Sequence, residues 1–129
     1  MARPASKHPT ELELEILKIL WKGEPLSGRQ IRDQLEPVRD LTYTSVMTML
    51  GIMEEKKYVR RRKVGGNYVY FARLEQQAAT QGMLRDLVER VFDGSAVSAM
   101  VHLLDVSEVD SDELRRLRKL IQEKAKEQP

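Results

Sequence analysis

The sequence has 129 residues, of which 41% are hydrophobic, with 22 Lys and Arg against 20 Asp and Glu. These proportions indicate a globular protein with one modest core or two small ones. Charges interrupt every apolar stretch before the ~18 residues that a membrane span needs, so we expect no transmembrane segment. The stretch from Met1 to His8 is not followed by an apolar run, so we expect no secretion signal. Because cysteine is absent, disulfides, thiolate nucleophiles and Cys-based metal sites are excluded.

The charges are unevenly distributed along the chain. Residues 1–74 contain 14 Lys and Arg against 9 Asp and Glu, whereas residues 75–129 contain 8 against 11. Within the basic half, six of the eight residues from Lys56 to Lys63 are cations. Such a run is by itself typical of a solvated face, so its meaning depends on the elements around it.

The first two predicted elements are amphipathic helices. The first begins at Thr10 and ends before Gly23, and its apolar stripe consists of Leu12, Ile16, Ile19 and Leu20. The second begins at Ser27, because Ser27-Gly28-Arg29-Gln30 has the S-x-x-Q form of a capping box, and Pro37 closes it. Each helix therefore has one apolar face to bury.

A third predicted helix and a basic hairpin follow. The helix begins near Thr42, whose hydroxyl can cap it, and turns three apolar residues inward, Val46, Leu50 and Met53. After Lys57 the pattern becomes extended, and two β-rich runs separated by Gly65-Gly66-Asn67 predict a β-hairpin that carries the cations. Helix, short helix, polar-faced helix and basic hairpin, in this order within about 70 residues, predict a winged helix-turn-helix.

The third helix and the hairpin carry the candidate DNA-binding residues. A recognition helix needs short polar side chains that reach base edges, and nearby cations contact phosphates or enter the minor groove. The candidates are Thr42, Tyr43, Thr44, Ser45, Met47, Thr48, Arg60, Arg61, Arg62, Lys63, Asn67 and Tyr68. For the helix residues alone, an ordinary solvated face is the plainer interpretation. The adjacent basic hairpin favours DNA binding.

The second half of the chain is predicted to be helical. Helices are expected from Glu75 to Phe92, from Ala96 to Leu104 and from about Glu108 to Glu127. The middle helix is apolar on most of its circumference, and so small a unit cannot cover that surface alone. We therefore expect a dimer. Its predicted interface consists of Leu84, Leu87, Val88, Val91, Val97, Met100, Val101, Leu104, Leu117 and Ile121.

The sequence lacks the combinations of residues that a catalytic or cofactor-binding site needs. His8 lies in a polar stretch and His102 in an apolar helix, where an interface or core histidine is the plainer interpretation. Gly65-Gly66 is not followed by a helix, so a hairpin turn is favoured over a phosphate loop. We expect no enzyme activity, no metal and no cofactor. A protein-interaction adaptor would leave the basic hairpin unexplained.

Several motifs occur in the order of a known protein family. They are the run from Glu11 to Trp21, Pro25-Leu26, Thr42 with Ser45-Val46 and Thr48-Met49-Leu50, Gly65 with Tyr68-Val69-Tyr70, Phe92-Asp93-Gly94-Ser95, and the run from Asp112 to Leu117. Through these motifs the chain resembles the penicillinase repressor family, of the BlaI and MecI type, over nearly its whole length.

The resemblance and the pattern together predict a mainly α fold, with a winged-helix DNA-binding domain at residues 1–74 and a helical dimerisation domain at residues 75–129. The resemblance implies a cytoplasmic homodimer that represses transcription at a palindromic operator in double-stranded DNA. It also implies a regulatory protease as a partner. In antibiotic-resistance members this protease cuts an Asn-Phe bond, whereas the matching position here is His102-Leu103. The alternative is a winged-helix regulator whose C-terminal helical domain senses a small molecule.

Overall fold

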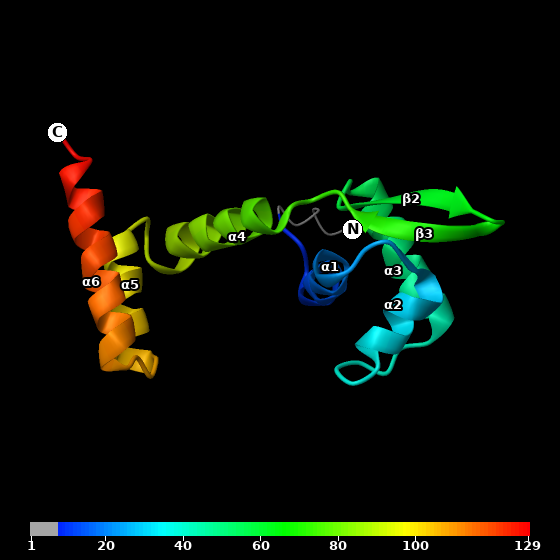
Figure 1. Cartoon of the computed structure of the whole chain (residues 1–129), viewed down its shortest axis with the longest axis horizontal. Helices are drawn as coiled ribbons and strands as arrows, with labels where there is room; N and C mark the ends of the chain where they lie inside the picture. Colours follow the sequence, from blue (N-terminus) through cyan, green and yellow to red (C-terminus); the bar gives the residue numbers. More distant parts are fainter. Residues whose placement is uncertain (1–7) are drawn as a thin grey trace. The chain divides into compact units, whose positions relative to one another are not determined.

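The computed structural model describes residues 8–129, and residues 1–7, where no secretion signal is predicted, lie outside the described residues. The chain divides into two compact units, one ending at Arg85 and the other beginning at Asp86. The elements are α1 (Glu11–Lys22), β1 (Leu26–Ser27), α2 (Gly28–Leu35), α3 (Tyr43–Glu55), β2 (Val59–Val64), β3 (Asn67–Ala72), α4 (Gln76–Val91), α5 (Ala96–Val106) and α6 (Ser111–Lys126) (Figure 1). The predicted mainly α fold with a small hairpin is confirmed.

Side-chain caps begin the first three helices where the sequence places them. The Thr10 hydroxyl accepts from the backbone N–H of Glu13, whose carboxylate accepts from the Thr10 N–H in return. Ser27 and Gln30 form the same reciprocal pair at the start of α2. Thr42 caps α3 through its hydroxyl. Because capping satisfies backbone donors that have no partner in the helix, these residues fix where each helix starts.

The sheet has three antiparallel strands in the order β1, β3, β2. Val64 pairs with Asn67, so the hairpin loop consists of Gly65 and Gly66 alone. Both glycines have a positive φ, which suits a two-residue turn whose twist matches that of the strands. The turn is therefore one residue shorter than predicted, since Asn67 belongs to β3. The two-residue strand β1 is an addition to the predicted hairpin.

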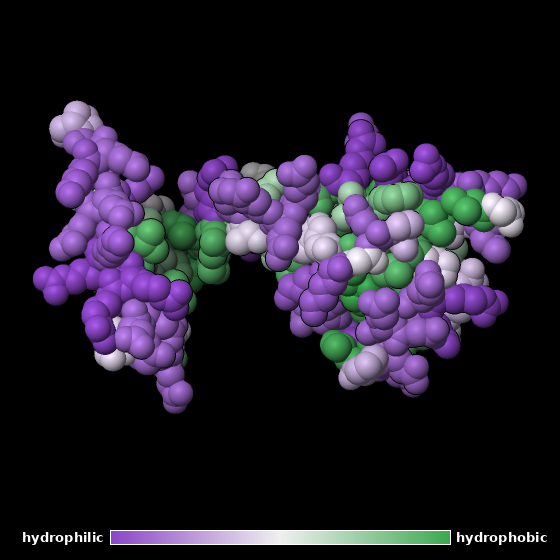
Figure 2. Space-filling model, viewed as in Figure 1, coloured by the Kyte–Doolittle hydropathy of each residue, from purple (hydrophilic) through white to green (hydrophobic). Residues whose placement is uncertain are grey.

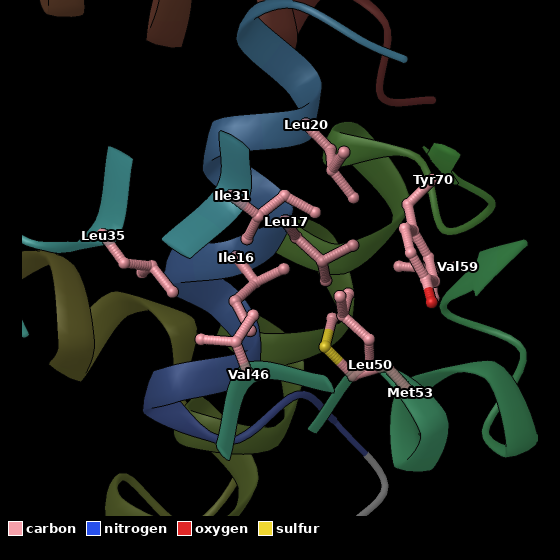
Figure 3. Close-up of a cluster of buried hydrophobic side chains, with 10 residues drawn as sticks. All are labelled: Ile16, Leu17, Leu20, Ile31, Leu35, Val46, Leu50, Met53, Val59 and Tyr70. Atoms are coloured by element: carbon pink, nitrogen blue, oxygen red, sulfur yellow. The ribbon is translucent and has the colours of Figure 1, made fainter. Parts of the chain in front are cut away.

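A cluster of apolar side chains, drawn in Figure 3, joins the three helices of the first unit to the sheet. Every member is at most 3% exposed. The cluster consists of Ile16, Leu17, Leu20, Ile31, Leu35, Val46, Leu50, Met53, Val59 and Tyr70. Burying a side chain of this kind contributes about 1.5–3 kcal/mol, so this cluster is the main source of the unit's stability. It includes the three residues that α3 was predicted to turn inward.

Ion pairs attach the segments that flank α3 to α1. Glu13 is 1% exposed, and its carboxylate accepts from Lys56 Nζ at 2.9 and 3.1 Å. Lys56 directly follows α3, whereas Arg39 lies in the loop before it and donates to the Glu15 carboxylate at 2.6 Å. The hydrogen bond and the charge of Glu15 raise the pKa of the Arg39 guanidinium. The segments before and after α3 are thus both tied to α1.

The helices of the second unit bury very little. Among residues 86–129, only Ala99 is buried, and the large apolar side chains of α5 and α6 that line its surface are 38–78% exposed. Figure 2 shows hydrophobic surface where α5 lies. Asp110 caps α6 by accepting from the Glu113 N–H, and this hydrogen bond lowers the pKa of the Asp110 carboxyl. None of the helices in residues 8–129 combines the length and the hydropathy of a membrane span.

Candidate nucleic-acid interface

The start of α3 presents short polar side chains to solvent. Thr44, Ser45 and Thr48 are exposed, as are Thr42 and Tyr43. The Ser45 hydroxyl accepts from the Thr42 hydroxyl at 2.9 Å. Its own proton remains able to donate, since a hydroxyl both donates and accepts. The opposite face of α3 lies in the core, so this face is held outward by the packing of the helix.

Met47 lies differently from these neighbours. It is half-buried and packs against the core cluster. A Cβ on Gly28 would lie 2.5 Å from the Met47 sulfur, so a side chain at this position would require the flexible end of Met47 to move. Met47 therefore supports the start of α2 while it keeps one side toward the surface.

The wing, which we define as β2, β3 and their turn, divides its cations between two faces. Alternate residues of a strand point to opposite sides, so Arg61 and Lys63 share the face that packs on the core, and Arg60 and Arg62 share the other. On that other face the Arg60 guanidinium lies 4.5 Å from the centre of the Phe71 ring. The predicted cations thus do not form one continuous patch.

Arg61 is engaged by two neighbours on its own face. Its Nε lies 3.3 Å from a carboxylate oxygen of Glu54, in the last turn of α3. Its guanidinium also lies 4.3 Å from the centre of the Tyr68 ring. Burial raises the pKa of the nearby Tyr70 hydroxyl, and the charge of Arg61 opposes that shift.

A recess of about 310 Å³ lies between the start of α2, the start of α3 and the wing. Four of the predicted DNA-binding residues line it together, namely Tyr43, Met47, Asn67 and Tyr68. Its lining also includes Arg29, whose guanidinium lies 4.7 Å from the centre of the Tyr43 ring. Arg29 was not among the predicted site residues, because nothing in the local pattern relates the first turn of α2 to the first turn of α3. Its one signal is its place beside the capping Ser27.

The predicted interface residues of the second half are exposed in the single chain, apart from the half-buried Val88. Leu103, Val106, Leu114 and Leu120 are exposed to a similar degree, although they are not among the predicted interface residues. His102 lies within α5, where its Nδ1 is 2.8 Å from the Ser98 carbonyl oxygen and its ring is 5.3 Å from that of Phe92. The ring is thus occupied by contacts within its own unit.

An outward-facing polar helix after a capped turn, followed by a basic hairpin, defines the winged helix-turn-helix class of DNA-binding proteins. The sequence profile of the family described as penicillinase repressor matches residues 9–123, and the chain belongs to this family. The predicted family is therefore confirmed.

The relatives of the chain include regulators from several bacteria. Transcriptional regulator BlaI of Mycobacterium tuberculosis is 31% identical over 115 residues, which cover 88% of this chain and 82% of the relative. Methicillin resistance regulatory protein MecI of Mammaliicoccus sciuri is 20% identical over 112 residues, which cover 87% and 91%. Among solved structures, a MarR family protein from Bacillus stearothermophilus has a TM-score of 0.46 at 19% identity, covering 91% of this chain and 76% of that one.

Proposed function

We propose that this protein is a dimeric transcriptional repressor that binds a palindromic operator in double-stranded DNA. The observation that carries the proposal is the recess at which the start of the recognition helix and the tip of the basic wing meet. Membership of the penicillinase repressor family supports the same function, as do relatives that are transcription regulators.

Different residues of the first unit would contact the bases and the phosphates of the DNA. Thr44, Ser45 and Thr48 would contact base edges in the major groove, with Tyr43 and Met47 beside thymine methyl groups. Arg60, Arg62 and Lys63 would contact phosphates from the wing, and Asn67 and Tyr68 would lie at its tip. Thr42 would act indirectly by capping the recognition helix.

A second copy of the chain would cover the exposed apolar faces of the C-terminal helices. Large apolar side chains on α4, α5 and α6 remain exposed in one chain, whereas a monomer ordinarily covers such a surface. A two-fold axis through these helices would give each apolar face a partner. It would also place two winged helices on half-sites about 34–36 Å, or a multiple of that, apart along the duplex.

A regulatory protease of the kind that the resemblance implies would have to cut within a folded helix. The His102–Leu103 bond lies inside α5 (Ala96–Val106), and each helical peptide bond is tied up in backbone hydrogen bonding. Cleavage there would require α5 to open locally, as happens in regions with few buried contacts. Limited proteolysis of the dimer would then cut at this bond more slowly than at an exposed loop.

Salt dependence tests the DNA-binding function. A preferred duplex is first selected from a random-sequence pool with the full-length protein, and a scrambled duplex of equal length serves as the control. Between about 50 and 200 mM salt, affinity for both duplexes should fall by roughly 10³-fold or more if about six phosphates are contacted. Selection that enriches no sequence, or affinity that does not change with salt, would contradict the proposed function.

A further inference from the structure

One cation of the wing is neutralised by the protein itself. Among the ion pairs of residues 8–129, that of Arg61 with Glu54 is the one that joins the wing to α3. A phosphate that approached Arg61 would be repelled by the Glu54 carboxylate beside its Nε. The pair also adds no net charge toward DNA. Arg61 is therefore poorly placed to act as a phosphate ligand, unlike Arg62 beside it.

The same pair spans three elements of the DNA-binding unit. Glu54 lies in the last turn of α3, Arg61 in β2 and Tyr68 in β3. Tyr68 pairs with Lys63, so the contact between Arg61 and the Tyr68 ring runs diagonally across the hairpin. The guanidinium thus connects the recognition helix to both strands of the wing.

Beyond this contact the tip of the wing is not held by burial. Every residue from Arg62 to Asn67 is exposed, and the core cluster contains two wing residues, Val59 and Tyr70, with Ala72 packed against it. The direction of the wing tip relative to α3 therefore depends on what holds the hairpin at its base. The contacts of Arg61 with Glu54 and Tyr68 lie between that base and the tip.

We propose that Glu54 and Arg61 are positioning residues that fix the wing relative to the recognition helix and thereby set the preference for operator over other DNA. A specific complex needs base contacts from α3 and backbone contacts from the wing at the same time. If the wing is mobile, forming the specific complex costs the entropy of ordering it. A non-specific complex does not require one fixed position of the wing, so it avoids most of that cost. The effect on DNA rests on the proposed function, but the effect on the wing does not.

Glu54→Gln in the full chain separates positioning from simple electrostatics. The substitution removes a negative charge near the DNA, so charge alone predicts tighter binding to every duplex. We expect binding to the scrambled duplex to stay the same or tighten, while preference for the selected duplex falls about tenfold, as for residues coupled by direct contact. Glu55→Gln is the matched control, since Glu55 is exposed and takes no part in the pair. It should leave the preference unchanged.

The order of the wing tip is measured without DNA. In the wild type we expect backbone ¹⁵N order parameters near 0.85 at Gly66 and Asn67, falling toward about 0.6 in Glu54→Gln and in Arg61→Gln. The double variant should be no worse than Arg61→Gln alone, because that substitution already removes the contact with Glu54.

Three results decide the outcome. Unchanged preference in Glu54→Gln, or equal losses of preference in Glu54→Gln and Glu55→Gln, would overturn the proposal. Unchanged order at the wing tip in both Glu54→Gln and Arg61→Gln would overturn it as well. A wild type that prefers no duplex would instead defeat the proposed function, and the order parameters would still test the positioning role.

Discussion

The two units of this chain reach their folded state by different means. The first unit surrounds ten buried side chains, drawn from three helices and two strands. In the second, among residues 86–129, only Ala99 is buried, and its helices present leucines and valines to solvent. The first unit therefore contains its own core, whereas the second presents apolar faces that its own helices do not cover.

The N-terminal and C-terminal halves of the sequence also differ in charge. Residues 1–74 carry an excess of cations and residues 75–129 an excess of anions. A polyanion such as DNA attracts the first half and repels the second. This charge distribution supports the proposal that one half contacts the nucleic acid and the other contacts protein. If it holds, thermal unfolding should show one transition that is independent of protein concentration and one that rises with it.

Leu50→Ala should give the largest effect on the first transition. Leu50 is fully buried in the core cluster, so its truncation should lower the free energy of unfolding of the first unit by about 2–5 kcal/mol. Calorimetry at two protein concentrations measures this. Leu120→Ala is the control, because Leu120 is 61% exposed in the single chain and should affect the concentration-dependent transition alone. If Leu50→Ala lowered the concentration-dependent transition and Leu120→Ala the other one, the first unit would not contain an independent core.

Lys56→Ala should follow in size, because it leaves the buried carboxylate of Glu13 without its cation. An unpaired buried group of this kind costs roughly 1–3 kcal/mol. Lys57→Ala removes the same charge from an exposed neighbouring position and should change stability much less. Chemical denaturation of both variants, followed by circular dichroism, makes the comparison. Equal losses would show that the Glu13–Lys56 pair does not hold the recognition helix.

Local signals explain what the sequence could predict. The caps at Thr10, Ser27 and Thr42 each involve residues three apart, so the sequence contains all the information that they need. Hydrophobic spacing likewise identified the inward face of α3. The winged helix and its candidate helix face followed from these elements and from the basic hairpin.

Contacts between residues distant in the sequence could not be predicted in this way. Nothing in the sequence around Glu13 indicates Lys56, 43 residues away, as its partner. The strand β1 is two residues long and therefore has no periodicity to detect. The stacking of Arg29 on Tyr43 and the pairing of Arg61 with Glu54 depend on how α2, α3 and the wing pack.

Thr48→Ala tests whether α3 contacts the bases of the selected duplex. If the Thr48 hydroxyl contacts a base, the substitution should cost about 1–3 kcal/mol of binding free energy on the selected duplex and much less on the scrambled one. Fluorescence anisotropy titrations with both duplexes measure the difference. Thr80→Ala, at an exposed position of α4, is the control and should change neither affinity. Equal losses on both duplexes would assign Thr48 to backbone contact instead.

Thr42→Ala should give the smallest effect. Its hydroxyl caps α3, so its loss should lower the stability of the first unit by about 0.5–2 kcal/mol. Thr42→Ser keeps the hydroxyl and should restore most of that stability. Only the concentration-independent transition should move in a thermal melt. A shift of the other transition would show that the two units do not unfold separately.

The self-association of the full chain shows whether the C-terminal helices form the dimer interface. Sedimentation equilibrium of the wild type should give twice the 14.9 kDa mass of one chain at the concentrations where it binds the selected duplex. Leu104→Asp places an unpaired charge in the proposed interface, so it should shift the protein to monomers or to a misfolded state and weaken operator binding. A wild type that sediments as a monomer, or a Leu104→Asp dimer with unchanged operator affinity, would contradict the assignment of the C-terminal helices as the dimer interface.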